Sequence, residues 1–128
     1  MNEPDIGQLH ATITPVGSRI TCTPPPTDTD RDWLVLVAWR HWTQFCDSLQ
    51  SKGWKRGGSA HSSSTCCSAH EFASFTLGID NVIATSSEDF HRRFLAATSV
   101  ARRLNLLLKP DRVALFQAVI YGNDVGAP

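Results

Sequence analysis

The chain has 128 residues, a length that suits one compact domain, and its 12 Lys and Arg residues balance 12 Asp and Glu residues. This balance gives no electrostatic reason to expect a nucleic acid or an acidic membrane surface as a partner. Apolar residues form 41% of the chain, enough for one core, but no apolar run approaches the ~20 residues that a bilayer crossing requires.

The first half of the chain predicts a lead-in, a stiff loop, a strand and a helix. Residues 1–15 are the lead-in, in which residues 12–14 are compatible with an extended segment. Three consecutive prolines after Thr23 predict an extended loop, because proline fixes its own φ and disfavours a helical conformation in the residue before it. The apolar run within residues 33–39 predicts a central strand buried on both faces. Apolar residues at three- and four-residue steps then predict a helix over about residues 40–52.

The middle of the chain predicts a loop and two further strands. Residues 55–70 are small and polar, which is typical of a loop. This loop carries two His and two Cys between His61 and His70, but their spacing matches no common zinc pattern, so we favour an exposed loop over a zinc site. Residues 71–77 and 81–85 predict strands on either side of a turn.

Residues 86–122 predict the C-terminal helices. Ser86 or Ser87 is suited to cap a helix over about residues 87–108, and Pro110 separates it from a second helix over residues 111–121. The expected core stripe of the first helix is Phe90, Phe94, Ala97, Ala101, Leu104 and Leu108. The chain is thus expected to be a single domain over residues 1–128, of the α+β class, with a small mixed β-sheet of about four strands and helices packed on it.

Carboxylates stand directly before the apolar strand. Residues i and i+2 of a strand point to the same side, so Asp30 and Asp32 form a pair whose mutual repulsion a divalent cation would relieve. Mg²⁺ suits such a pair, because it takes oxygen ligands and keeps positions open for phosphates. Asp28 extends the row, and a register that pairs Asp28 with Asp30 is the alternative, although the directly following strand favours Asp30 and Asp32. Taken alone, such an acidic stretch is more often a solvated turn.

A Gly17-Ser18-Arg19 turn precedes the acidic pair by about ten residues. Glycine lets a phosphate approach the backbone closely, the Ser18 hydroxyl can bind phosphate oxygens, and Arg19 can add positive charge for a polyphosphate. A single Gly-Ser pair carries little information, but its combination with Asp-x-Asp before an apolar strand is more specific.

These two elements resemble the nucleotidyltransferase superfamily, which has the DNA polymerase β-like fold. Its pattern is Gly-Ser at the start of a short helix, followed by a strand that bears Asp-x-Asp, and residues 17–19 and 29–35 match it. The motifs span roughly residues 10–85. The tail from Phe90 to Gly122 resembles that of small nucleotidyltransferase-like proteins encoded by bacteriophages.

The resemblance implies Mg²⁺-dependent transfer of a nucleoside monophosphate from a nucleoside triphosphate to an acceptor hydroxyl. Asp30 and Asp32 would hold the metal, and Gly17, Ser18 and Arg19 would bind the phosphates. The family also uses a third carboxylate, for which Asp80 is the first candidate and Glu71 the second. If the family position falls on Asn81 instead, that carboxylate is lost and a degenerate enzyme is expected.

Three hypotheses follow for the function. The first is an active nucleotidyltransferase whose acceptor is a small molecule, a tRNA or a protein. The second is a catalytically weak binding module of the same fold, for instance a phage factor that engages a host protein or a nucleotide, with an exposed apolar patch for its partner. The third is an unrelated α+β domain with an incidental acidic cluster.

Other features bear on the partners and the compartment. The acidic N-terminus is unlike a signal peptide, and the cysteines match no secreted scaffold, so a cytoplasmic protein with reduced thiols is expected, in the host cytoplasm if a phage encodes it. The basic residues of the C-terminal half are expected on a solvated helix face, with a groove for a nucleotide or an RNA acceptor as the alternative; they are Arg92, Arg93, Arg102, Arg103, Lys109 and Arg112.

Overall fold

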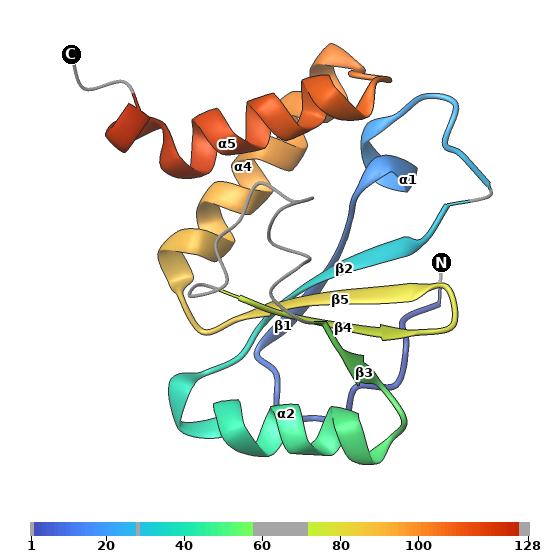
Figure 1. Cartoon of the computed structure of the whole chain (residues 1–128), viewed down its shortest axis with the longest axis vertical. Coiled ribbons are helices and arrows are strands. Elements are labelled where there is room, and N and C mark those ends of the chain that lie inside the picture. Colours follow the sequence, from blue (N-terminus) through green and yellow to red (C-terminus); the bar gives the residue numbers. More distant parts are fainter. Residues whose placement is uncertain (1, 28, 58–71, 126–128) are drawn as a thin grey trace.

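The computed structural model describes residues 2–27, 29–57 and 72–125, which form a five-stranded mixed sheet with helices on both faces (Figure 1). In pairing order the strands are β1 (Thr12–Val16), β2 (Arg31–Leu36), β5 (Asp80–Thr85), β4 (Ala73–Leu77) and β3 (Lys55–Arg56). β2 and β5 are parallel neighbours at the centre, and the other pairs are antiparallel. The predicted α+β class with a small mixed sheet is confirmed, whereas its likeness to the nucleotidyltransferase fold stays a prediction.

Two groups of helices enclose the sheet from opposite sides (Figure 1). The 3-10 helix η1 (Trp39–His41) leads into α2 (Trp42–Ser51), which covers one face. The other face carries α1 (Ser18–Thr21), α4 (Glu88–Leu104) and α5 (Lys109–Val125). None of the helices in the described part of the chain has the length and apolar character that a membrane crossing requires.

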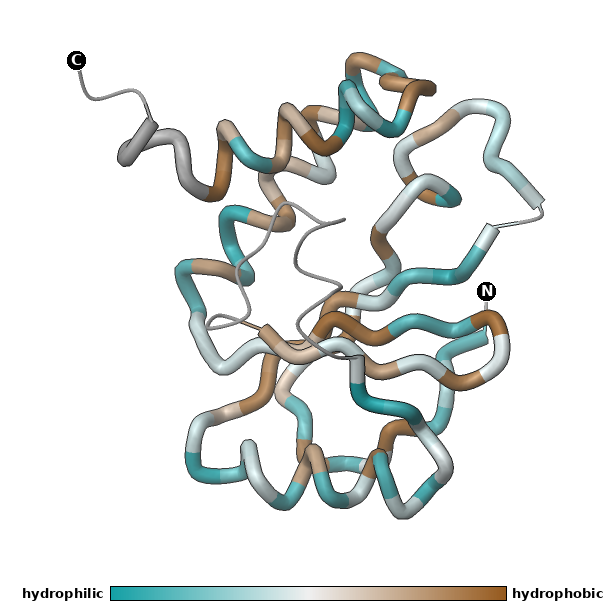
Figure 2. Tube along the Cα trace, viewed as in Figure 1, coloured by the Kyte–Doolittle hydropathy of each residue, from teal (hydrophilic) through white to brown (hydrophobic). Residues whose placement is uncertain are grey.

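Strand β2 separates two hydrophobic clusters because its side chains alternate between the faces. Trp33 and Val35 pack with α2, whereas Leu34 packs with α4 and α5, and all three are almost fully buried. The prediction that this strand is buried on both faces is confirmed. Its boundaries differ from those expected, since pairing begins at Arg31 and ends at Leu36. Figure 2 shows the hydrophobic centre of the sheet as brown segments of β2 and β5.

The first C-terminal helix begins as expected but ends early. The Ser87 side chain accepts a hydrogen bond from the backbone N–H of Phe90, which confirms the predicted cap. The helix stops at Asn105, which adopts a left-handed conformation (φ 49°), rather than near Pro110. The expected core positions Leu104 and Leu108 are therefore wrong: they are 61% and 65% exposed.

The turn between α4 and α5 presents an apolar patch, which consists of Leu104, Leu107 and Leu108. All three leucines are more than half exposed, and Figure 2 shows brown segments at this corner of the molecule. An asparagine that ends the helix one turn before the predicted point leaves these side chains outside the core. Three exposed leucines within one short segment differ from the scattered single apolar side chains that are normal on a protein surface.

Several sequence predictions fall on residues outside the described ranges. These are the His61–His70 loop with its candidate zinc ligands, Asp28 as an alternative metal ligand, and Glu71 as a second candidate for the third carboxylate. The start of the expected loop lies within the described residues and differs from the prediction, since Lys55 and Arg56 pair with β4 as the edge strand β3.

Candidate functional site

The Gly-Ser turn and the acidic strand, separate in the sequence, meet in the structure. The last residue of β1, Val16, pairs with Asp32 at the start of β2, so the following Gly17 lies against the Asp32 side chain. A Cβ atom on Gly17 would be 2.2 Å from Asp32 Oδ2 and 2.9 Å from Asp32 Cβ. Gly17 also has a φ of +82°, in the left-handed region that favours glycine. Glycine is therefore required at this position, and the space that it leaves is filled by the carboxylate.

Asn81 is the partner of Asp32 on the next strand. Parallel pairing of β2 with β5 aligns these two residues, and Asn81 Nδ2 donates a 3.0 Å hydrogen bond to Asp32 Oδ1. Burial raises the pKa of Asp32, and the neighbouring Asp30 raises it further, whereas the Asn81 hydrogen bond and the positive charges of Arg19 and Lys109 lower it. The net shift is upward, so the ionised form of Asp32 is costly in the absence of a cation.

Asp30 lies just before β2 and is exposed. Its negative charge contributes to the raised pKa of Asp32, so the two carboxylates interact near the start of β2. Within the described ranges Asp30 makes no hydrogen bond or ion pair, so its oxygens are accessible to a ligand. The same part of the chain contains no group of three or more His, Cys, Asp or Glu residues that could hold a metal ion.

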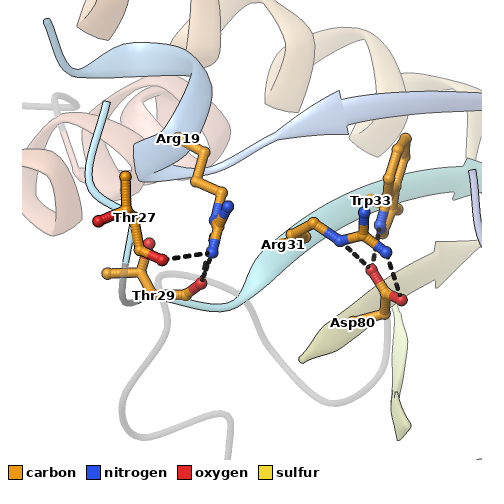
Figure 3. A network of polar contacts seen from close by, with 6 residues as sticks. All are labelled: Arg19, Thr27, Thr29, Arg31, Trp33 and Asp80. Carbon is orange, nitrogen blue, oxygen red and sulfur yellow. Dashed lines mark hydrogen bonds and ion pairs between the residues drawn. The ribbon is translucent and has the colours of Figure 1, made fainter. Parts of the chain in front are cut away.

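Asp80, the first candidate for a third carboxylate, does not join this pair. It aligns with Arg31 and not with Asp32, and neighbouring residues of a strand point to opposite faces. Arg31 donates to both oxygens of Asp80 at 2.8 Å, and Trp33 Nε1 donates to Oδ1 at 3.0 Å (Figure 3). Burial acts to raise the pKa of Asp80, but the bonds from Arg31 and Trp33 and the Arg31 charge outweigh it, and the pKa is lowered. Asp80 therefore has a structural role as the acceptor of this network.

Arg19 also differs from its expected role. Its guanidinium extends from α1 to the loop before β2, where it donates to the backbone carbonyls of Thr27 and Thr29 (Figure 3). Ser18 is the first residue of α1 and half-buried, one residue beyond the glycine that contacts Asp32. Of the expected phosphate-binding group, Gly17 thus lies against Asp32, Ser18 follows it in the chain, and Arg19 binds the loop before β2.

Lys109, one of the basic residues that the sequence assigns to a solvated face or to a nucleotide groove, is the first residue of α5, and its charge lowers the pKa of Asp32. The contacts that bring α5 to this place join the α4–α5 turn to the end of α1: Asn105 Nδ2 donates to the Thr23 carbonyl, and the Cys22 thiol donates to the Leu106 carbonyl. The spacing of the basic residues does not single out Lys109 among them, because its position depends on how two distant segments pack.

Three of the other basic residues are engaged in contacts within their own two helices and the turn between them. Arg92 and Arg93 pair with Asp89 on their own helix, and Arg93 also donates to the Ile120 carbonyl. Arg112 donates to the Leu106 carbonyl. Arg93 and Arg112 are half-buried and hold α5 and the α4–α5 turn in place, whereas Arg92, Arg102, Arg103 and Lys109 are exposed, as a solvated helix face predicts.

No family model matches the chain, and no curated protein or solved structure is significantly similar to it.

Proposed function

We propose that this protein binds a Mg²⁺-nucleoside triphosphate as a catalytically weak, nucleotidyltransferase-like binding module. One observation carries the proposal: the backbone of Gly17 lies against the carboxylate of Asp32. Two motifs that would each be unremarkable alone occupy one corner of the sheet. Because the Asp32 carboxylate fills the space beside Gly17, phosphates on a metal ion held by the acidic pair would approach the turn at Ser18.

The donor set suits one magnesium ion. Asp30 and Asp32 supply oxygen ligands, and Mg²⁺ accepts one or two carboxylates together with phosphates and water. A cation would also relieve the electrostatic cost of the partly desolvated Asp32 carboxylate. Lys109 adds positive charge on the α5 side, which favours a polyanionic ligand over a neutral one.

Weak catalysis follows from Asn81. It occupies the strand position directly beside Asp32 and donates a hydrogen bond to it. An amide cannot accept a proton from an attacking hydroxyl, so it cannot replace a carboxylate as a general base. A site of this composition can bind a nucleotide far better than it can transfer one.

The apolar patch of Leu104, Leu107 and Leu108 supports the binding-module hypothesis, which expects an exposed surface for a partner. A host protein, if the chain is phage-encoded, is the partner class that this hypothesis proposes. Transfer to a small molecule, a tRNA or a protein is the second candidate function. It is favoured by the acidic pair itself and requires a third carboxylate, for which Glu71 is the remaining candidate.

Isothermal titration with Mg²⁺ and each nucleoside triphosphate tests the proposal, combined with an assay for pyrophosphate release. We expect metal-dependent nucleotide binding in the wild type that Asp30→Asn removes, with little or no pyrophosphate release. Asp47→Asn is the matched control, because Asp47 is an exposed aspartate on α2, which covers the opposite face of the sheet. Absence of binding in the wild type refutes the proposal. Rapid pyrophosphate release that Glu71→Gln removes favours the enzyme instead.

A further inference from the structure

Arg19 connects the two halves of the candidate site. Its backbone follows directly after the Gly17-Ser18 turn, and its side chain ends in the loop that leads to the acidic pair (Figure 3). Nε donates to the Thr29 carbonyl at 3.0 Å, and Nη2 donates to the carbonyls of Thr27, at 3.1 Å, and Thr29. The two hydrogen bonds to Thr29 are partly buried and are therefore shielded from competition by water, whereas the one to Thr27 is exposed.

Both neighbours of Asp30 are fixed in this way. Thr29 is held by Arg19, and Arg31 is held by its bidentate pair with Asp80 and by the 2.7 Å bond from its N–H to the Ile79 carbonyl. Asp30 itself is exposed, with its carboxylate unbonded within the described ranges. The backbone is thus restrained on each side of a carboxylate that remains open to a ligand.

We propose that Arg19 is a positioning residue that holds Asp30 beside Asp32, and that it sets the affinity for the metal ion rather than contacting phosphate. This inference rests on the proposed function, since it assumes that the pair binds a metal. A carboxylate held in place loses less conformational entropy when it binds a cation, so restraining its backbone increases the affinity.

The chemistry of arginine explains why this residue type is needed. Its planar guanidinium presents several donors in a fixed geometry, so that Nε and Nη2 bond two carbonyls at once. A lysine would keep the positive charge but offers a single ammonium group on a flexible stem. Arg19→Lys therefore separates positioning of the loop from simple attraction of a phosphate.

The test measures binding of Mn²⁺, as a spectroscopic substitute for Mg²⁺, by electron paramagnetic resonance of the free ion in the absence of any nucleotide. We expect Arg19→Lys to weaken Mn²⁺ binding by about tenfold or more, the range typical of residues that orient metal ligands. The matched control is Arg93→Lys, which removes another arginine-to-carbonyl contact, at Ile120, and should leave Mn²⁺ affinity unchanged.

The outcomes separate this inference from the proposed function. If Arg19→Lys binds Mn²⁺ with the affinity of the wild type, positioning by Arg19 is refuted. If this variant also has a lower affinity for the nucleotide, Arg19 is a phosphate ligand instead. If the wild type does not bind Mn²⁺, or if Asp30→Asn binds it equally well, the proposed function is refuted. This inference then fails with it.

A measurement on the wild type covers the case in which the variant does not fold. The Nε–H resonance of Arg19 should be observable by nitrogen-proton correlation NMR, because its hydrogen bond to Thr29 slows exchange with water. Addition of inorganic triphosphate with Mg²⁺ should leave this hydrogen bond intact and the resonance protected. Loss of protection, which release of the guanidinium to the phosphates would cause, overturns the proposal.

Discussion

Replacement of Asn81 by aspartate is the sharpest test of how this site is built. The Asn81 Nδ2–Asp32 Oδ1 bond, 3.0 Å long, is replaced by two carboxyl groups at the same separation. Loss of a hydrogen bond to a charged group costs about 1.5–3 kcal/mol. Repulsion adds to this, up to about 4 kcal/mol at 4 Å in an effective dielectric of 20, but proton uptake by one carboxyl limits it.

We therefore expect Asn81→Asp to lower the free energy of unfolding by about 2–4 kcal/mol without metal, which lowers Tm by about 10 °C in a domain of this size. Mg²⁺ should reverse much of this loss, because a third carboxylate strengthens the metal site, and a ligand at 100 times its Kd contributes about 2.7 kcal/mol. The Mg²⁺-induced rise in Tm should thus be larger in the variant than in the wild type.

The assay is thermal unfolding followed by circular dichroism, with and without Mg²⁺, together with pyrophosphate release from nucleoside triphosphates. Asn105→Asp is the matched control: it removes the bond from Asn105 Nδ2 to the Thr23 carbonyl, 3.2 Å long, and should show no gain in Mg²⁺ response. An Asn81→Asp protein that is as stable as the wild type without metal, or that gains nothing from Mg²⁺, refutes the reasoning. Accelerated pyrophosphate release would show that the missing base had limited catalysis.

Three further predictions follow from the same geometry. Asp32→Asn should raise Tm at neutral pH. The folded wild type favours the protonated form of Asp32, so it loses stability as the pH rises through the raised pKa of this group. In thermal melts over a pH series, the difference in Tm between variant and wild type should therefore vanish near pH 4. Gly17→Ala should destabilise the fold by about 1–3 kcal/mol because of backbone strain, and by more because of the clash with Asp32. A chemical denaturation midpoint equal to that of the wild type would contradict this. Asp80→Asn should lower Tm by a few degrees at neutral pH, and this deficit should disappear on acidification through the lowered pKa of Asp80, because the ion pair with Arg31 is then lost in the wild type as well.

Regular elements with a strong local pattern were predictable. The continuous apolar run at residues 34–37 predicted a strand buried on both faces, and the burial of Leu34 and Val35 confirms it. The cap at Ser87 is equally local, because it depends only on a hydroxyl placed before a helical sequence. The end of α4 was not predicted correctly, because Asn105 in a left-handed conformation stops the helix before the more conspicuous Pro110.

The sequence by itself determined the chemical content of the candidate site: an acidic pair at the start of a buried strand and a glycine-serine turn before it. Both depend on neighbouring residues, and the strand period of two predicts that Asp30 and Asp32 share one side, although β2 begins only at Arg31. Only the tertiary structure decided which residue of β5 faces that pair. A shift of one residue in strand register reverses every side chain, so the pairing that aligns Asn81 with Asp32 sends Asp80 to the opposite face. The conformation of the loop before β2 turned Arg19 to the carbonyls of Thr27 and Thr29. The packing of distant segments let the charge of Lys109 act on Asp32, because this depends on the fold as a whole and not on local spacing.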